Sequence, residues 1–503
     1  MSRNLFLIPL LHQSFPRRLQ QILRNSFSPQ IFSSKICSVC LQNHRSFAST
    51  RQSYAQQTTF ASAAASEKHE SERSSPEAVE PKTSDWQQHQ PEAWKSQFQP
   101  PEPQLNWEYL CNPDNLEFIR ENIAHRKGVG DIDKVHHLWN AYQRAQSEEE
   151  KQMVWQQLLS EGFHIPNTSH PDSPIGEESN ARTAKVHSQK KEFDFQPKTV
   201  VELGERLQML RTDNVTMTTG PRTYYFLGEL ARLEQALIRF TLSRLKEKGF
   251  QLVSVPDLLN PQIIESCGFK TQGERTQVYR LKDTHGPVCL AGTAEMSLGG
   301  LFMNEVFDEK DLPKKVTAVS RCYRAETSDI AEEKGIYRVH QFTKVEMFGL
   351  TSDEGNDESG QLLQELLDIE QELFVSLGLH FRVLDMATEE LGAPAHRKFD
   401  IETWMPGKEF WGEISSASNC TDFQSRRLNI HYRDKTGNLK FAHTVNGTAC
   451  ANPRMVMALL ENNQKQDGSV VLPKALEPWL GSSVLSPPKH KDPFMRMQDR
   501  RKR

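Results

Sequence analysis

Charged and aromatic residues occur at every second position in a stretch between Val316 and Phe348. We expect two antiparallel strands here, residues 316–326 and 336–348, joined by a polar loop. Because side chains alternate between the two faces of a strand, Arg324 and Glu326 would share one face of the first strand. The matching face of the second strand would carry Arg338, His340, Phe342, Lys344 and Glu346.

Two interpretations fit this charged face. A cross-strand ladder of salt bridges on a solvated sheet would use the same residue types. In a nucleotide site, arginine would bind a phosphate in bidentate fashion, glutamate would accept a hydrogen bond from an adenine amino group, and the aromatic ring would stack on the base. The opposite face is only moderately apolar, which favours the nucleotide site; its residues are Tyr337, Val339, Thr343, Val345 and Met347.

A third charged position lies near the C-terminus, at Arg454. We expect a short strand over residues 441–445, then Asn446-Gly447, and then a helix that begins near residues 452–454, because Asn is a favoured cap and Pro fits the first turn. An arginine at a helix N-terminus adds charge where the backbone dipoles already attract anions. This position therefore predicts a phosphate site, although a lone arginine there is also common on an ordinary surface.

Other elements of the sequence would position these charges. Apolar residues at helical spacing predict a long helix over residues 230–245, followed by Gly249, a strand over 250–255 and Pro256. Alone, this unit indicates only a packed core. The glycines at 268 and 273 have the spacing of a phosphate-binding P-loop, but Glu274-Arg275 follows them instead of Lys-Ser/Thr. If ATP is bound, a P-loop does not hold it.

The order of these elements resembles a known family. A helix, strand and proline, then an arginine-bearing strand, loop and strand, then a strand and a helix with arginine in its first turn are similar to the three signature motifs of class II aminoacyl-tRNA synthetases. The finer similarity is to the seryl enzymes, and it covers roughly residues 165–480. It is carried by Thr293-Ala294-Glu295, Arg324-Ala325-Glu326, residues 337–348, residues 413–427, and residues 444–448 together with Arg454.

The resemblance implies an α+β fold, in which helices flank an antiparallel sheet and a short N-terminal helical arm precedes it. It also implies an enzyme that uses ATP and Mg²⁺ to join L-serine to tRNA(Ser) through a seryl-adenylate, and that forms a homodimer through its first motif. Such chemistry would consist mainly of positioning and charge neutralisation. Hydrogen bonds to the serine hydroxyl would reject analogues that lack it.

The resemblance also implies roles for individual residues. Arg324, Glu413 and Arg454 would be catalytic: Arg324 would bind the α-phosphate and the serine carboxylate, and Arg454 the terminal phosphates. Magnesium would be bound by Glu413 and Ser416. Serine would be bound by Thr293, Ala294, Glu295, Arg324, Glu346 and Thr448. ATP would be bound by Arg324, Ala325, Glu326, Val339, Phe342, Glu413, Ile414, Ser415, Ser416 and Arg454.

The ends of the 503-residue chain differ in composition from its middle. The first 66 residues contain no Asp or Glu but several Arg and Lys among Ser, Phe and Leu, which is typical of a mitochondrial transit peptide cleaved near residues 50–66. A secretory signal would place its charge before one apolar core, whereas arginines here continue to Arg51. We therefore predict the mitochondrial matrix. Residues 67–103 would be a disordered linker and residues 486–503 a basic disordered tail.

Between linker and tail we expect two domains. Residues 104–165 would be a helical tRNA-binding arm, either as two short antiparallel helices or as one continuous helix. Members of the seryl family usually have a longer hairpin, so we expect this short arm to leave tRNA binding to the catalytic domain and to shorter RNA contacts. Residues 166–485 would be the catalytic domain. No apolar run approaches the ~20 residues that span a bilayer, so we expect no membrane insertion.

Two other functions remain possible from the sequence. A synthetase-like protein could bind RNA or a partner protein without catalysis, but such proteins normally lose the motif arginines or carboxylates, and Arg324, Glu346, Glu413 and Arg454 are all present. A class II synthetase for another amino acid would keep the two arginines but lose Thr293-Ala294-Glu295 and Asn446-Gly447-Thr448. The net charge of −4 decides nothing about a nucleic-acid partner.

Overall fold

The computed structural model describes residues 100–212, 218–273, 276–282, 286–326 and 335–489. The predicted transit peptide, nearly all of the predicted linker and most of the predicted tail lie outside these residues. Within the described ranges, no helix is both long enough and apolar enough to cross a membrane.

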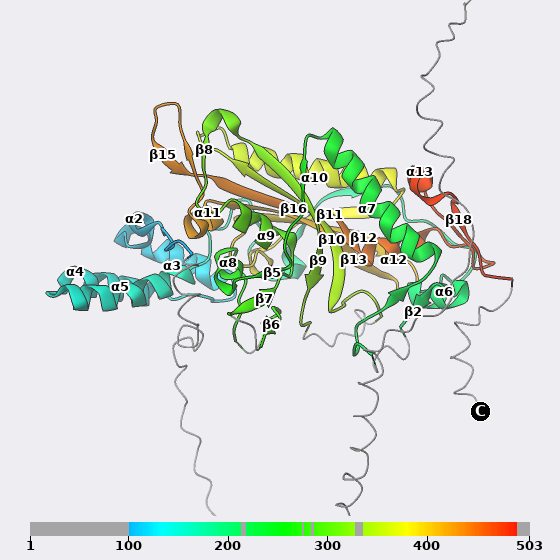
Figure 1. The fold of residues 1–503 in the computed structure, drawn as a ribbon, viewed down its shortest axis with the longest axis horizontal. Coiled ribbons are helices and arrows are strands. Elements are labelled where there is room, and N and C mark those ends of the chain that lie inside the picture. Colours follow the sequence, from blue (N-terminus) through cyan, green and yellow to red (C-terminus); the bar gives the residue numbers. More distant parts are fainter. Residues whose placement is uncertain (1–99, 213–217, 274–275, 283–285, 327–334, 490–503) are drawn as a thin grey trace, which may run out of the picture. The chain divides into compact units, whose positions relative to one another are not determined.

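An eight-stranded sheet forms the centre of the described part, and the fold is of the α+β class (Figure 1). Neighbouring strands are antiparallel except β4 and β9, which pair in parallel. In their order across the sheet the strands are β1 (Arg182–His187), β11 (Phe381–Asp385), β12 (Arg397–Met405), β13 (Phe410–Thr421), β16 (His443–Asn452), β10 (Gln341–Thr351), β9 (Lys314–Tyr323) and β4 (Gln251–Val253).

Helices pack against both faces of this sheet, and β10 shows how the alternation of a strand divides the two cores. Val345 and Met347 lie in a core with α7, α10 and α12, whereas Phe348 and Leu350 lie in a second core with α8 and α9. The helices are α6 (Val200–Leu207), α7 (Glu229–Glu247), α8 (Pro261–Ser266), α9 (Ala294–Leu301), α10 (Glu358–Ser376), α11 (Phe423–Leu428), α12 (Arg454–Asn462) and α13 (Glu477–Leu480).

Short strands complete the periphery of the fold. They pair as β2 with β3, β5 and β6 with β7, β8 and β15 with β14, and β17 with β18. Their bounds are β2 (Leu210–Arg211), β3 (Tyr225–Phe226), β5 (Leu258–Leu259), β6 (Arg280–Leu281), β7 (Val288–Leu290), β8 (Val306–Asp308), β14 (His431–Arg433), β15 (Leu439–Phe441), β17 (Val470–Val471) and β18 (Val484–Leu485).

The predicted helix, strand and proline unit is confirmed as α7 followed by β4. Leu230, Leu233 and Leu237 are fully buried, so the apolar stripe of α7 faces the core as its spacing predicts. Gly249 follows the helix with φ of 84°, a left-handed conformation that glycine adopts at no steric cost. The strand is shorter than the predicted span of 250–255.

The charged hairpin is only partly as predicted. β9 ends at Tyr323 and β10 begins at Gln341, so the prediction that residues 324–326 and 336–340 belong to strands is wrong. Beyond the strands, the backbone N–H of Arg324 still donates to the His340 carbonyl at 3.0 Å. The return bond of this pair is missing, because the His340 N–H donates to the carbonyl of Arg222, in a distant part of the chain, at 3.1 Å. Phe342, Lys344 and Glu346 do lie on β10 at alternate positions, and so on one face.

The third charged element also differs from its prediction. β16 runs from His443 through Asn446-Gly447 to Asn452, so the predicted short strand over 441–445 is wrong in both bounds. The strand continues because β10 and β13 pair with it on its two sides. Helix α12 begins at Arg454, as predicted, but its cap residue is Pro453 and no side chain caps the helix.

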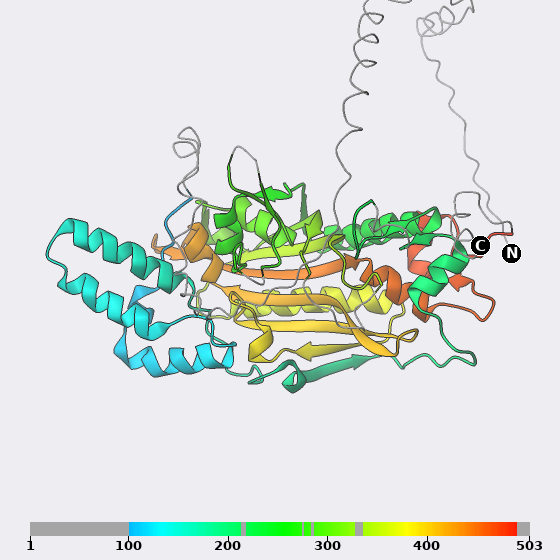
Figure 2. The ribbon, with the colours of Figure 1, turned by 90° about the horizontal axis from the view of Figure 1, so that it is seen from below.

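The N-terminal arm consists of helices packed around a small core of its own, built mainly from Ile119, Ile132, Val135 and Leu158. It contains α4 and α5 as two separate helices, which is the two-helix alternative, and it lies at one end of the central sheet, opposite α6 and α13 (Figure 2). Its helices are α2 (Trp107–Leu110), α3 (Leu116–His125), α4 (Ile132–Arg144) and α5 (Glu148–Phe163).

Candidate functional site

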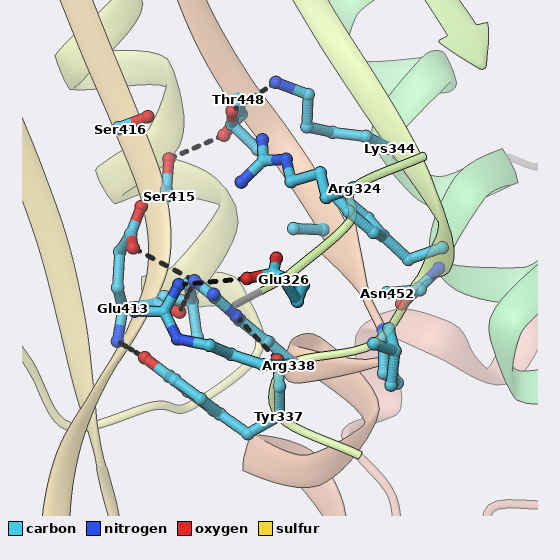
Figure 3. Close-up of a pocket in the computed structure, with 16 residues that line it drawn as sticks. Arg324, Glu326, Tyr337, Arg338, Lys344, Glu413, Ser415, Ser416, Thr448 and Asn452 are labelled. Atoms are coloured by element: carbon cyan, nitrogen blue, oxygen red, sulfur yellow. Dashed lines mark hydrogen bonds and ion pairs between the residues drawn. The ribbon is translucent and has the colours of Figure 1, made fainter. Parts of the chain in front are cut away.

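A cavity opens on the face of the sheet that carries Phe342 and Lys344 (Figure 3). Its empty space, counted to the open mouth, is about 530 Å³. The predicted site residues that line it are Arg324, Glu326, Val339, Phe342, Glu413, Ile414, Ser415, Ser416, Thr448 and Arg454. Those that do not line it are Thr293, Ala294, Glu295, Ala325 and Glu346.

Two β-bulges bring side chains to this face. In β13 the pairing with β12 shifts by one residue at Ile414, so Glu413 and Ser416, three positions apart, come to the same side of the sheet. In β16 the pairing with β10 shifts at Ala449, which leaves Thr448 directly opposite Glu346. Without these bulges, the strict two-residue period would turn Ser416 away from Glu413.

The open part of the cavity is built around Arg454. Its Nη1 donates to Glu413 Oε2 at 3.0 Å and to the Glu413 carbonyl at 3.1 Å, and its guanidinium stacks on the Tyr337 ring at 4.3 Å. The Tyr337 hydroxyl also contacts Glu413, because its oxygen accepts a hydrogen bond from the backbone N–H of Glu413 at 2.9 Å. These contacts join the turn before β10, the strand β13 and the helix α12.

The charge of Glu413 is set by its cations. Burial alone would raise the pKa of this carboxyl, but Arg454, Lys398 and Arg324 overcome it and hold the pKa at about 2. Glu413 is therefore ionised throughout the neutral range. Together with the Ser416 hydroxyl on the same face, it offers hard oxygen donors, which suit Mg²⁺.

No group of three or more His, Cys, Asp or Glu side chains in the described ranges could hold a metal by itself. Magnesium commonly binds through one or two carboxylates, with waters and substrate phosphates as its other ligands. The pair Glu413 and Ser416 fits that kind of site.

Arg324 and Glu326 enter the cavity from the segment after β9. The Arg324 guanidinium lies over the Phe342 ring at 5.1 Å. Glu326 is 8% exposed, and its Oε2 lies 3.7 Å from Arg338 Nη1, beyond hydrogen-bond distance. Among the described residues this oxygen has no hydrogen-bond partner, so it can accept one from a ligand.

A buried cluster of Glu295, Lys344, Glu346 and Thr448 adjoins the open cavity. Lys344 Nζ lies 2.5 Å from Glu346 Oε2 and 3.3 Å from Thr448 Oγ1, and Thr448 Oγ1 donates to Glu346 Oε2 at 3.3 Å. Burial raises the pKa of Glu346 although Lys344 opposes the rise. Glu346 does not line the cavity itself, but it contacts Lys344 and Thr448, which do.

Glu295 belongs to this cluster through its charge and through α9. Burial, and then the neighbouring Glu346, raise the pKa of Glu295 to about 7, while Lys344 acts in the opposite direction. Thr293 caps α9 and accepts the backbone N–H of Glu295 at 3.2 Å, so its hydroxyl has a structural partner as well as the predicted substrate role. Ala294 is fully buried, and the backbone N–H of Ala325 donates to the carbonyl of Gln277.

The cavity also contains residues that were not predicted as site residues. Arg338 and Lys344 belong to the predicted charged face, so their charge is the feature of the sequence that could have identified them as site residues. Tyr337 was placed on the opposite face, because residues 336–340 were expected to continue the strand. The lining residues that were not predicted are Tyr337, Arg338, Lys344, Ala451, Asn452 and Pro453.

Comparisons with known proteins agree with this geometry. Residues 279–463 match the profile of a family described as the tRNA synthetase class II core domain (G, H, P, S and T). A solved seryl-tRNA synthetase from Pyrococcus horikoshii, complexed with ATP, superposes with a TM-score of 0.68 at 30% identity, covering 76% of this chain and all of that chain. Fold, site and profile together define a class II tRNA synthetase.

Proteins with similar sequences identify the family within this class. A serine–tRNA ligase from Rubrobacter xylanophilus is 42% identical over 68% of this chain and 80% of its own length. A mitochondrial serine–tRNA ligase from Mus musculus is 50% identical over 67% of this chain. The match spans 65% of the length of that mouse protein, slightly less than two thirds. The chain belongs to the serine–tRNA ligase family.

Proposed function

We propose that this protein joins L-serine to tRNA(Ser) at the expense of ATP, through a seryl-adenylate. One observation carries the proposal: Arg324 and Arg454, which lie far apart in the sequence, face one cavity that also contains the ionised Glu413. Two fixed cations suit a bound polyphosphate and the negative charge that develops on it during transfer. Membership of the serine–tRNA ligase family supports the choice of serine.

The ATP would occupy the open cavity. Phe342 would stack on the adenine beside Val339, and Glu326 would accept a hydrogen bond from the adenine amino group through its unpartnered oxygen. Arg324 would hold the α-phosphate, and Arg454, at the N-terminus of α12, the terminal phosphates. These positions come from three stretches of the chain, residues 324–326, residues 339–342 and Arg454, and together they would leave the nucleotide little freedom.

The serine would lie between the open cavity and the buried cluster. Glu295 and Glu346 would accept hydrogen bonds from its ammonium group and its hydroxyl, and Thr448 adds a hydroxyl beside them. Arg324 would hold the serine carboxylate against the α-phosphate. The carboxylate oxygen would then attack the α-phosphorus in line as the bond to the bridging oxygen breaks and pyrophosphate leaves.

The second step transfers the seryl group. A hydroxyl of the terminal ribose of the tRNA would attack the carbonyl carbon of the mixed anhydride, and AMP would leave. Neither step needs a covalent bond to the protein, so the side chains act by orientation and by neutralising charge. Magnesium, when bound at Glu413 and Ser416, would supply further positive charge beside the phosphates.

Three further properties belong to the same proposal. The α4–α5 hairpin would contact tRNA, although helices of 13 and 16 residues reach only about 20–24 Å. The acid-free leader, and mitochondrial relatives from Mus musculus and Bos taurus, support a place in the mitochondrial matrix. A homodimer would form through the α7–β4 unit.

Serine-dependent exchange of pyrophosphate into ATP tests the proposed function. We expect exchange with L-serine, but none with L-threonine or L-alanine, and a fall of at least about 10²-fold in Arg324→Ala, because a cation that acts on the transition state is lost. Exchange with another amino acid would redirect the specificity. If the folded wild-type protein shows no exchange, the proposed enzymatic function is wrong, and a role in binding RNA or a partner protein replaces it.

A further inference from the structure

The carboxylate of Glu295 is held from one side only. Its Oε1 accepts the side-chain amide of Gln424 at 2.6 Å and that of Asn446 at 3.0 Å. Among the described residues, no recorded hydrogen bond ends on Oε2. Two neutral donors on one oxygen fix the plane of the carboxylate and leave the other oxygen for a ligand.

Gln424 is itself held in one orientation. It is fully buried, and its Oε1 accepts a hydrogen bond from Thr444 Oγ1 at 2.7 Å. A buried amide that receives a hydroxyl donor on its oxygen must turn its NH₂ group the other way. That group therefore points at Glu295, and it can only donate.

The helix that carries Gln424 is too short to be rigid alone. α11 has six residues, and isolated helices of that length are not stable in water. It is anchored instead to the base of the arm. Arg427 Nη2 donates to the Phe163 carbonyl at 3.0 Å, and its guanidinium lies over the Phe163 ring at 5.1 Å. The backbone N–H of Gln104 donates to the Arg426 carbonyl at 2.7 Å.

We propose that Gln424 is a positioning residue for serine recognition, which orients the carboxylate of Glu295 toward the substrate ammonium group from a helix anchored to the base of the arm. The proposal rests on the proposed function, because it takes Glu295 to be a serine ligand. Gln424 does not line the open cavity, so we expect its effect to be on serine and not on ATP.

The charges around Glu295 predict how loss of the Gln424 hydrogen bond changes the pH dependence of serine binding. The hydrogen bond from Gln424 stabilises the ionised form of Glu295, whose pKa burial and Glu346 raise to about 7. Loss of this donor would raise the pKa further, so more of the carboxyl would be neutral at a given pH and unable to pair with an ammonium group. The other titratable groups whose charges act on Glu295 or feel its charge are Glu346, Lys344, Arg324, Cys267 and Cys420.

The test is Gln424→Met, measured by pyrophosphate exchange in the full-length protein from pH 6 to pH 9. Met has a similar volume but cannot donate. We expect the KM for serine to rise about tenfold to hundredfold at pH 7.5, the usual effect of losing one hydrogen bond to a charged group. The KM for ATP should change less than about twofold, and the pH at which serine binding weakens should move upward.

Gln464→Met is the matched control. Gln464 is also a buried glutamine (1% exposed) with three hydrogen bonds, to Lys198 N, the Lys198 carbonyl and the Glu461 carbonyl, but it lies outside the site. It should leave the ratio of the two KM values and the pH profile unchanged. Equal rises in both KM values in Gln424→Met, or an unmoved pH profile, would overturn the proposal.

Thr444→Val covers the case in which Gln424→Met does not fold. It removes the hydroxyl that orients Gln424 and keeps the amide itself. We expect the same selective rise in the KM for serine, smaller at about threefold, because the amide can then rotate. If the wild-type protein shows exchange but Thr444→Val has no selective effect on the KM for serine, the positioning role is refuted and the proposed function stands. If the wild-type protein shows no exchange, the proposed function itself is refuted.

Discussion

The open cavity and the buried cluster both contain carboxylates, yet the two regions treat them in opposite ways. In the open cavity, Arg454 and its neighbours outweigh burial and hold the pKa of Glu413 at about 2. In the buried cluster, burial dominates: Glu295 is 6% exposed and its pKa rises to about 7, although Lys344 lies near it. The number of cations within reach therefore decides which carboxylates stay charged.

In the proposed function, this difference would give the two regions separate tasks. A permanently charged Glu413 can face metal-bound phosphates at any physiological pH. A carboxyl that titrates near neutrality instead binds a cationic group only when it is ionised, and its neutral form is a poor partner for an ammonium group. The two substrates should therefore respond differently to mutation and to pH.

The largest effect should come from Arg454→Met. The substitution removes the cation that opposes Glu413 and the phosphate charge, and we expect the rate of exchange to fall about 10²–10³-fold. The matched control is Arg244→Met, because Arg244 pairs with Glu247 on the surface, with 51% of its side chain exposed. A loss of less than about tenfold would show that the open cavity does not stabilise the transferring phosphate.

The pH dependence should separate the two regions directly. In the proposed function Glu295 pairs with the serine ammonium group, for which it must be ionised. The KM for serine should therefore rise as the pH falls through about 7, by about tenfold between pH 8 and pH 6. The KM for ATP should stay flat over this range, because Glu413 remains ionised far below it. Parallel changes in the two KM values would show that the buried cluster and the cavity titrate as one unit.

Much of the open cavity follows from local sequence, whereas the buried cluster does not. Arg324, Glu326 and Arg454 could be predicted because a charged residue in a strand or at a helix start stands out from its neighbours. The sequence pattern places Tyr337 and Arg338 on strand faces, although they lie before β10. The hydrogen bond from His340 to Arg222 cannot be predicted from local sequence, because it joins distant segments. The bulge at Ile414 likewise depends on the partner strand β12 and not on the sequence of β13 alone.

Gln424 shows the same limit within a segment that the family resemblance already covered. It lies among residues 413–427, which resemble the seryl enzymes, yet nothing in that segment indicates that its amide meets Glu295, 129 positions earlier. The general α+β class and the order of motifs were predictable, because periodicity and caps are local properties. Contacts between buried polar groups from distant segments depend on how the whole sheet is assembled.

The smallest expected effect concerns Glu370, a buried carboxyl that does not line the open cavity. It is fully buried on α10, and a Cβ added to Gly447 would lie 2.7 Å from its Oε1. Burial raises its pKa well above the usual value of 4.5. For an acid whose pKa is raised in the folded state, the contribution to stability is fully present below pH 4.5 and is lost as the pH rises through the folded-state pKa. Glu370→Gln, which stays neutral, should therefore increase the free energy of unfolding by about 1 kcal/mol at pH 7.5, and by less at pH 5, in urea titrations. A destabilised variant at pH 7.5 would show that the ionised carboxylate, and not the neutral acid, belongs to the native state.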